Sequence, residues 1–296
     1  MFRREQLRAL GATLPFAVLV LVSLALVAPQ RGLTERGRYA LRDWGGPPVG
    51  VVYHIPVGSD KDTPIVIIIP GAQRNAGVYR EQWDHLAQAN KFICLTLEGT
   101  HDRFPSEYEY NCGGVMTADG KVSDEEKWLF SAIEPLFDDF KKRFGSKVKT
   151  YALYGHSAGG GFVHRFMLFK PDASVSVAVA ANPAFYTMPD STVPYPFGLK
   201  AAPLAKRALE RWFGSKLIVM LGEQDLGPRT KALSNGRDAR KQGSSCFTRG
   251  QRFFEVAQKK AKKVGATLEW QLESVPFVGH SNAHMASHAV KHLLQN

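Results

Sequence analysis

Residues 154–161, Tyr-Gly-His-Ser-Ala-Gly-Gly-Gly, form the stretch of sequence that decides the fold. An apolar run at 148–154 leads into it, and an apolar helical segment follows it as far as Phe169. In this setting the pattern G-x-S-x-G predicts a sharp turn from a strand into a helix, with Ser157 on the turn. Such a turn needs small neighbours because its backbone is strained, and the glycines at 155 and 159 supply the room. A plain glycine-rich turn is the alternative.

Strand-like and helix-like segments alternate on both sides of this turn. Apolar runs predict strands at 51–53, 64–69, 92–97, 148–154, 175–181, 216–221 and 268–275. Apolar periodicity predicts helices near 79–86, 129–144, 158–169, 248–264 and 283–294, with Thr248 and Gln251 capping the fourth of them. This alternation predicts an α/β fold with a doubly wound, mostly parallel sheet over residues 45–296. The proline-rich interval 185–213 breaks the pattern, and we expect a small lid-like insertion there.

Ser157 needs two partners before it can act as a nucleophile. A base must take the proton of its hydroxyl, and a carboxylate must orient that base. Asp225 follows the predicted strand at 216–221, and His280 follows the next one, so both are expected at the carboxyl ends of strands. The order Ser, Asp, His also suits a serine on this kind of turn. We therefore predict Ser157, Asp225 and His280 as catalytic residues, with Glu223 as an alternative acid.

Other histidines compete for these roles. His156 adjoins the serine, but on a tight turn its ring is expected to point elsewhere. His284, His288 and His292 recur at i, i+4 and i+8, a spacing that raises the question of a metal site. This stripe lies opposite the apolar side of the last predicted helix and contains no carboxylate, so we expect it to face solvent. The sequence predicts no metal site.

Acyl chemistry also requires donors for the negative oxygen that develops during the reaction. The backbone N–H of Ala158, which follows the serine, is one expected donor. The second is expected from the loop at 70–73, Pro-Gly-Ala-Gln, where either Ala72 or Gln73 could supply it. An ordinary strand-to-helix turn is the alternative interpretation of that loop.

Four parts of the sequence carry a family resemblance: 154–159, 180–183 with 186–189, 222–225 and 278–280. Over about 51–294 the chain resembles the esterase and polyhydroxybutyrate-depolymerase-like branch of the α/β-hydrolases. The resemblance implies hydrolysis of a small-molecule or oligomeric carboxylic ester through an acyl-enzyme, with no cofactor and no metal. Pro70-Gly71 replaces the His-Gly of many lipases, and no additional domain for binding a solid polymer is evident.

Two other functions use the same features. An acyltransferase would employ the same triad but pass the acyl group to an alcohol instead of water. A non-catalytic, membrane-tethered binding module would have the hydrolase fold without catalytic activity. The presence of Ser157, Asp225 and His280 argues against such a loss of activity. We expect an ester hydrolase.

The first thirty residues resemble a targeting segment. Arg3, Arg4 and Arg8 precede an apolar stretch at 10–28, which predicts either a cleaved signal peptide or a membrane anchor. The folded part is therefore expected to be exported (periplasmic or secreted) or anchored to a membrane.

Charge and cysteine content add two expectations. The formal net charge is +11, but the basic residues are spread along the chain and the densest run, 259–263, lies on a predicted helix, so no nucleic-acid partner is indicated. Cys94 lies in an apolar run and is expected to be buried. Cys112 and Cys246 lie in loop-like stretches, and either a disulfide between them or two free thiols fits an exported protein.

Overall fold

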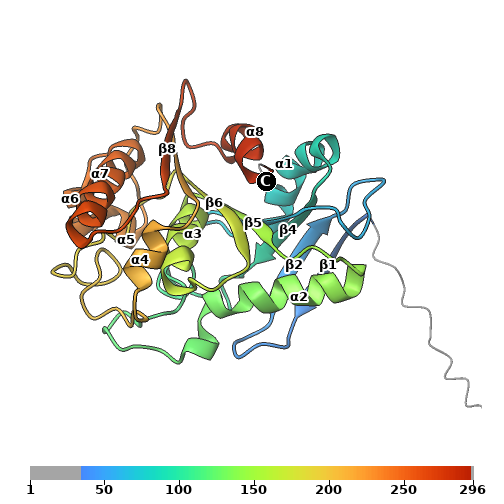
Figure 1. The fold of residues 1–296 in the computed structure, drawn as a ribbon, viewed down its shortest axis with the longest axis horizontal. Coiled ribbons are helices and arrows are strands. Elements are labelled where there is room, and N and C mark those ends of the chain that lie inside the picture. The colour runs from blue at the N-terminus through green and yellow to red at the C-terminus, as the bar shows by residue number, and fades with distance from the viewer. Residues whose placement is uncertain (1–34, 295–296) are drawn as a thin grey trace, which may run out of the picture. The chain divides into compact units, whose positions relative to one another are not determined.

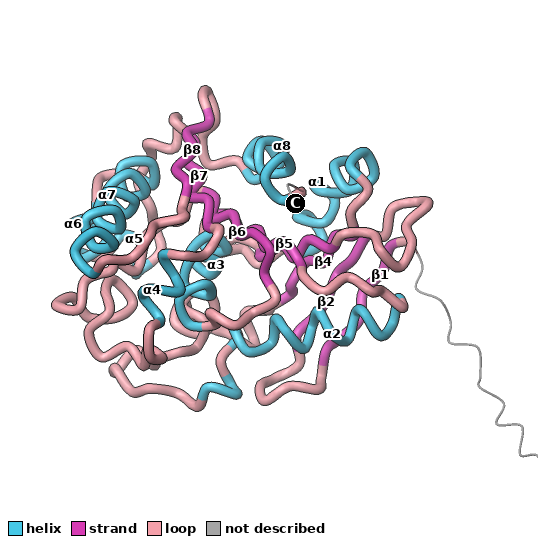
Figure 2. Tube along the Cα trace, viewed as in Figure 1, coloured by secondary structure: helices cyan, strands magenta, loops and turns pink. Residues whose placement is uncertain are grey.

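A computed structural model describes residues 35–294. Its centre is an eight-stranded sheet with the order β1-β2-β4-β3-β5-β6-β7-β8, drawn in magenta in Figure 2. The six strands β3 to β8 are parallel to one another, whereas β2 runs antiparallel to both of its neighbours, β1 and β4. The predicted mostly parallel sheet is therefore confirmed. The strands are β1 Arg36–Leu41, β2 Val49–His54, β3 Ile65–Ile69, β4 Ile93–Glu98, β5 Tyr151–His156, β6 Val175–Ala181, β7 Leu217–Gly222 and β8 Gln271–Val275.

Helices cover both faces of the sheet (Figure 1). On one face α1 (Ala76–Asn90) packs beside α8 (Asn282–Leu293), and their apolar residues form one core with that side of the strands. On the other face α2 (Ile133–Phe144), α3 (Ala158–Phe169) and α7 (Cys246–Val264) enclose a larger core. The shorter helices are η1 Glu125–Lys127, η2 Leu129–Ala132, α4 Ala208–Phe213, α5 Ala232–Asn235 and α6 Arg237–Gln242.

The central strand β3 shows why this sequence needs helices on both faces. All five of its residues are buried, and they alternate between the two cores: Ile65, Ile67 and Ile69 face one, and Val66 and Ile68 the other. Burying a side chain of this size contributes about 1.5–3 kcal/mol. An apolar run without a polar face can therefore fold only at the centre of a two-sided sheet.

The two edge strands are less buried than the centre. The antiparallel strand β1 was not predicted, and it begins upstream of the expected domain start at residue 45. Its sequence, Arg-Gly-Arg-Tyr-Ala-Leu, carries charged residues because that edge is partly exposed, which hides the usual apolar signal. At the opposite edge β8 pairs only with β7, and most of its residues are at least partly exposed.

Helix α7 begins earlier than predicted. Its N-cap is Ser245, whose side chain accepts the N–H of Thr248, while the Thr248 side chain accepts the N–H of Ser245. The expected cap by Thr248 and Gln251 is therefore wrong, and Thr248 instead occupies the third helical position of a capping box. The helix ends at Gly265 with a left-handed backbone.

The three cysteines are all buried free thiols. Cys94 lies in β4, as predicted. The interpretation of Cys112 and Cys246 as a disulfide is wrong in this structure, because Cys112 packs in the core while Cys246 begins α7. Burial raises the pKa of both thiols to about 12, so both remain protonated near neutral pH.

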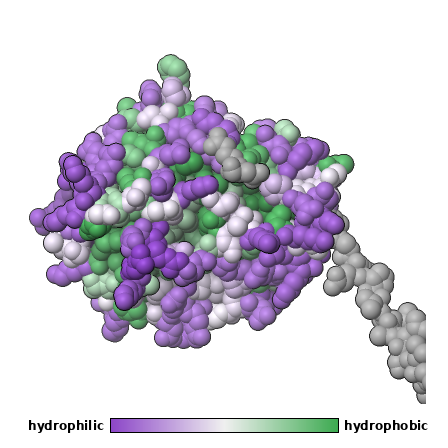
Figure 3. Space-filling model, viewed as in Figure 1, coloured by the Kyte–Doolittle hydropathy of each residue, from purple (hydrophilic) through white to green (hydrophobic). Residues whose placement is uncertain are grey.

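The segment expected as a lid packs largely against the main core. Tyr186, Met188, Tyr195 and Leu199 are buried there, so a role as a lid stays a prediction. The predicted signal or anchor at residues 1–30 lies outside the described residues. Within residues 35–294, no helix is long and apolar enough to cross a membrane. The face of the molecule in Figure 3 is mostly hydrophilic, with apolar residues between the polar ones.

Candidate active site

Ser157 lies on a strained turn between β5 and α3. Its φ and ψ are 60° and −118°, a conformation that a residue with a side chain rarely adopts. Neighbouring chain segments approach so closely that only glycine fits around it. A Cβ at Gly159 would lie 1.9 Å from the carbonyl oxygen of Ile69, and one at Gly155 would lie 2.2 Å from that of Gly159. The turn that the sequence predicts is therefore present, and it presents Ser157 at the carboxyl end of β5.

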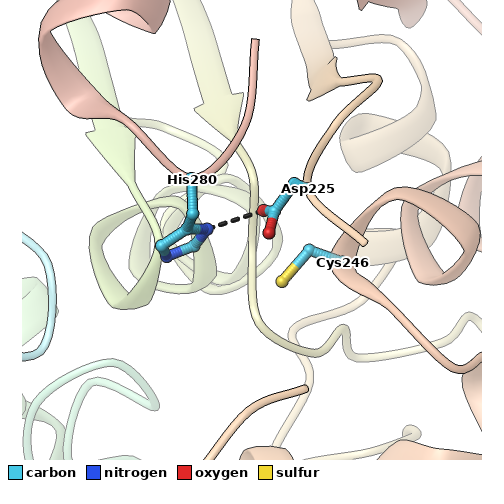
Figure 4. Close-up of side chains that lie close together, drawn as sticks. All are labelled: Asp225, Cys246 and His280. Carbon is cyan, nitrogen blue, oxygen red and sulfur yellow. Dashed lines mark hydrogen bonds and ion pairs between the residues drawn. The ribbon is translucent and has the colours of Figure 1, made fainter. Parts of the chain in front are cut away.

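The structure brings Ser157, His280 and Asp225 into one chain of hydrogen bonds. His280 Nε2 lies 2.8 Å from Ser157 Oγ, and His280 Nδ1 lies 2.6 Å from Asp225 Oδ2. Figure 4 shows the second contact as a dashed line. The Asp225 side chain is only 1% exposed, and that of His280 is 25% exposed. Asp225, and not Glu223, contacts His280.

Asn182 joins the loops that carry the acid and the base. Its Oδ1 accepts the N–H of Gly222 at 2.8 Å, and its Nδ2 donates to the carbonyl of Gly279 at 3.2 Å. It is fully buried and has a φ of 45°. This asparagine lies within one of the resembling stretches, but the sequence alone gives it no role because its two partners lie 40 and 97 residues away.

Two further side chains adjoin the Asp225 carboxylate. Arg229 Nη2 donates to Asp225 Oδ1 at 3.2 Å. The thiol of Cys246 belongs to a group of three potential metal ligands, with Asp225 and His280, whose atoms all lie within 4.8 Å of one another (Figure 4). A cation there would have to displace the His280–Asp225 bond, ionise a buried thiol and lie near Arg229, so this set is poorly suited to a metal.

His156 is buried beside the base. Its Nδ1 lies 3.2 Å from the hydroxyl of Tyr79, and the direction of its ring relative to Ser157 stays a prediction. Its ring packs against that of His280, with 4.6 Å between the ring centroids. Burial lowers the pKa of His156 well below its ordinary value, so the ring stays neutral at neutral pH.

The predicted oxyanion donors line the same cavity as Ser157. The cavity has a volume of about 500 Å³, and its walls include Ala158, Ala72 and Gln73. Ala158 begins α3, where the first N–H groups have no partner within the helix and can donate to an anion. The loop bearing Ala72 is anchored by Tyr110, whose hydroxyl donates to the carbonyl of Pro70 at 2.8 Å. The choice between Ala72 and Gln73 stays a prediction.

The cavity walls are charged as well as polar. Arg229 and Lys231 contribute positive charge from the loop after β7, and Glu107 contributes a carboxyl group from the loop after β4. Burial raises the pKa of Glu107, while the backbone N–H of Leu233 donates to it. The cavity can therefore offer both cationic and hydrogen-bonding groups to a polar substrate.

The histidine stripe on α8 lies away from these residues. His284 and His288 are exposed, as predicted. His292 is not, because its Nε2 contacts the carboxyl group of Glu273 on β8. The expectation that the whole stripe faces solvent is wrong for that one residue, whose partner on the neighbouring strand was not apparent from the helix alone.

This sheet, its strained serine turn and the hydrogen-bonded Ser-His-Asp chain define a serine hydrolase of the α/β-hydrolase fold. Comparison with solved structures then gives the family: the chain belongs to the esterase and polyhydroxybutyrate-depolymerase-like branch of the α/β-hydrolases. No protein-family model matches the sequence, and no curated protein does.

Two solved structures are similar over nearly their whole length. Poly(aspartic acid) hydrolase-1 from Sphingomonas sp. KT-1 is 40% identical, with a TM-score of 0.84 over 88% of this chain and 98% of that one. LpqC, a poly(3-hydroxybutyrate) depolymerase from Bordetella parapertussis, is 27% identical, with a TM-score of 0.82 over 86% and 88%. The siderophore hydrolase EstB from Aspergillus nidulans, 15% identical with a TM-score of 0.54 over 88% and 95%, shares the fold alone.

Proposed function

We propose that this hydrolase cleaves carboxylic esters through a covalent acyl-enzyme on Ser157. The observation that carries the proposal is the unbroken hydrogen-bond chain from Ser157 Oγ through His280 to Asp225. In this scheme His280 is the general base and Asp225 orients it.

The reaction would proceed in two halves. In the first, His280 Nε2 takes the proton of Ser157 as its oxygen attacks the ester carbonyl, and the N–H groups of Ala158 and of Ala72 or Gln73 stabilise the oxyanion. The C–O bond to the alcohol then breaks, and the alcohol leaves with the proton from His280. In the second, His280 takes a proton from water as the water oxygen attacks the acyl carbon. The bond from that carbon to Ser157 Oγ then breaks, and His280 returns the proton to Oγ, which releases the acid and restores the Ser157 hydroxyl.

A covalent probe and a substrate panel test this proposal. A fluorophosphonate should label the purified protein once, and Ser157→Ala should abolish both the label and ester turnover. Nitrophenyl esters from acetate to palmitate should then define the accepted acyl length. Labelling or turnover that survives in Ser157→Ala would contradict the proposal. Adding an alcohol during turnover distinguishes the acyltransferase alternative, which predicts a transfer ester as the main product.

A second candidate is hydrolysis of amide bonds in an acidic polymer. The similarity to a poly(aspartic acid) hydrolase supports it, and so do Arg229 and Lys231 in the cavity wall, which suit a substrate bearing carboxylates. Incubation with poly(aspartic acid), followed by size-exclusion chromatography, would reveal shortening of the polymer. The same assay with Ser157→Ala is the control. An unchanged polymer alongside active ester turnover would leave only the first candidate.

We also propose that the folded domain is exported, because basic residues precede an apolar segment at 10–28. A C-terminal tag followed through cell fractionation tests this. A membrane-bound intact chain would indicate an anchor, and a shortened soluble chain outside the cytoplasm would indicate a cleaved signal. Recovery of the intact chain in the cytosol would contradict export.

A further inference from the structure

Arg229 shares the triad carboxylate with the base. It lies on the loop after β7, and its Nη2 donates to Asp225 Oδ1 at 3.2 Å and to the carbonyl of Gly227 at 3.3 Å. His280 takes the other carboxylate oxygen, at 2.6 Å. The Arg229 side chain is 18% exposed, and Asp225 is its one ion-pair partner within the described chain. The guanidinium and the imidazole therefore compete electrostatically for a single buried negative charge.

Few charges act on His280 directly. The ring of His156 is neutral because burial lowers its pKa, and the thiol of Cys246 is neutral because burial raises its pKa to about 12. Asp225 and Arg229 are the charged members of this contact network, and Lys231 and Glu107 line the same cavity. The titratable groups around His280 come from four places in the fold. They are His156 and Ser157 at the end of β5, Tyr79 on α1, Asp225 and Arg229 on the loop after β7, and Cys246 at the start of α7.

We propose that Arg229 is a positioning residue for the reaction at Ser157. It fixes the Asp225 carboxylate in the orientation that His280 needs, and it offsets part of the negative charge that Asp225 presents to the base. This inference rests on the proposed function, because it assigns Arg229 a role through His280. Arg229 would then be a fourth side chain that acts together with Ser157, His280 and Asp225.

The charge effect has a definite sign. A carboxylate beside an imidazole stabilises the protonated ring, which cannot accept the proton of Ser157. A guanidinium is always charged, and on the far oxygen of that carboxylate it weakens this stabilisation. The guanidinium of Arg229 therefore opposes the electrostatic effect of the Asp225 carboxylate on the base. Removing Arg229 should move the acid limb of the kcat/KM profile to higher pH.

The orientation effect appears in kcat. Without Arg229, Asp225 Oδ1 loses its guanidinium donor, and the carboxylate can rotate away from His280. We expect Arg229→Gln to lower kcat on the pH plateau by about tenfold, since positioning contributes on this scale. KM for a neutral ester should change little, because the contact with Asp225 is separate from ester binding.

Three variants separate these effects when kcat and KM for a neutral nitrophenyl ester are measured from acid to alkaline pH. Arg229→Gln should shift the acid limb upward by about one pH unit. Arg229→Lys keeps the positive charge but loses the planar guanidinium. The acid limb of its kcat/KM profile should therefore lie at the same pH as in the unaltered protein, while its kcat stays low. Arg237→Gln removes an exposed arginine from the start of α6, outside the cavity, and should match the unaltered protein.

Each contrary result overturns the inference. An unmoved acid limb in Arg229→Gln, or an equal shift in Arg237→Gln, would refute the charge effect. Full kcat in Arg229→Lys would refute the positioning effect, and this variant decides that point even if the glutamine variant does not fold. A rise in KM confined to anionic esters would assign Arg229 to substrate binding instead. Failure of the proposed function is a separate result, because it would appear as undiminished turnover in Ser157→Ala.

Discussion

Replacing Asn182 with alanine tests how the acid and base loops are held together. The change removes the acceptor of the Gly222 N–H and the donor to the Gly279 carbonyl, both beside the triad. A buried N–H left without a partner costs about 1–3 kcal/mol, and loss of the second bond costs about 1 kcal/mol. The φ of 45° adds a small penalty, because asparagine tolerates that backbone better than alanine does. We expect the free energy of unfolding to fall by about 2–4 kcal/mol.

The effect on turnover follows from the same contacts. Gly279 adjoins His280, so freeing its carbonyl lets the base loop move relative to Ser157. A displacement of about 1 Å at a reacting group can cost a hundredfold in rate. The loss of about 2–4 kcal/mol should lower the melting temperature by about 4–16 °C, on the scale of about 2–4 °C per kcal/mol for a large domain.

Thermal melts and ester kinetics on Asn182→Ala and Asn182→Asp provide the assay. The aspartate keeps an acceptor for Gly222 but sets a carboxylate oxygen against the Gly279 carbonyl at a fully buried position, so neither the stability nor kcat should recover. If Asn182→Ala keeps the melting temperature and kcat of the unaltered protein, the two bonds do not hold the site, and the reasoning is refuted.

Three further predictions concern the triad and its surroundings. Asp225→Asn should lower kcat by about 10⁴ while Glu223→Gln stays mild, and kinetics with the reverse ranking would assign the acid to Glu223. His280→Ala should remove nearly all turnover, whereas His284→Ala, on the exposed side of α8, should retain most of it. If turnover survives in His280→Ala and is lost in His284→Ala, then His284 is the base. The buried His156 and His164 have pKa values well below their ordinary value, so the unfolded chain binds protons that the folded chain does not. Stability should therefore fall as the pH drops below about 6.5, the ordinary value for histidine, and His156→Gln should flatten that slope in melts run from pH 8 to 5.

The sequence carried enough information to place the triad because each member follows a recognisable strand. Apolar runs end just before Ser157, Asp225 and His280, and parallel strands bring their carboxyl ends to one edge of the sheet. The glycines around Ser157 were also informative, because a Cβ at those positions would meet neighbouring backbone atoms.

Features that depend on distant partners could not be predicted in this way. The strand β1 pairs along its length with β2, yet its charged residues give no apolar signal. Arg229 and Asn182 matter through contacts that only the folded chain creates. Cys246 was expected in a loop, because the cap of α7 at Ser245 uses a serine and a threonine where a glutamate would have been easier to recognise.

Because β8 lies at the edge of the sheet, heating should displace the base His280 before it displaces the nucleophile Ser157. Ser157 rises from the most protected part of the molecule, whereas His280 follows a half-exposed strand that is paired on one side only. Proteins open locally at such edges at a smaller free-energy cost than global unfolding requires. Fraying of β8 would disconnect the base while the rest of the sheet remained native. We therefore expect heating to inactivate the protein at a temperature below the one at which its core melts, because the edge strand β8 opens first.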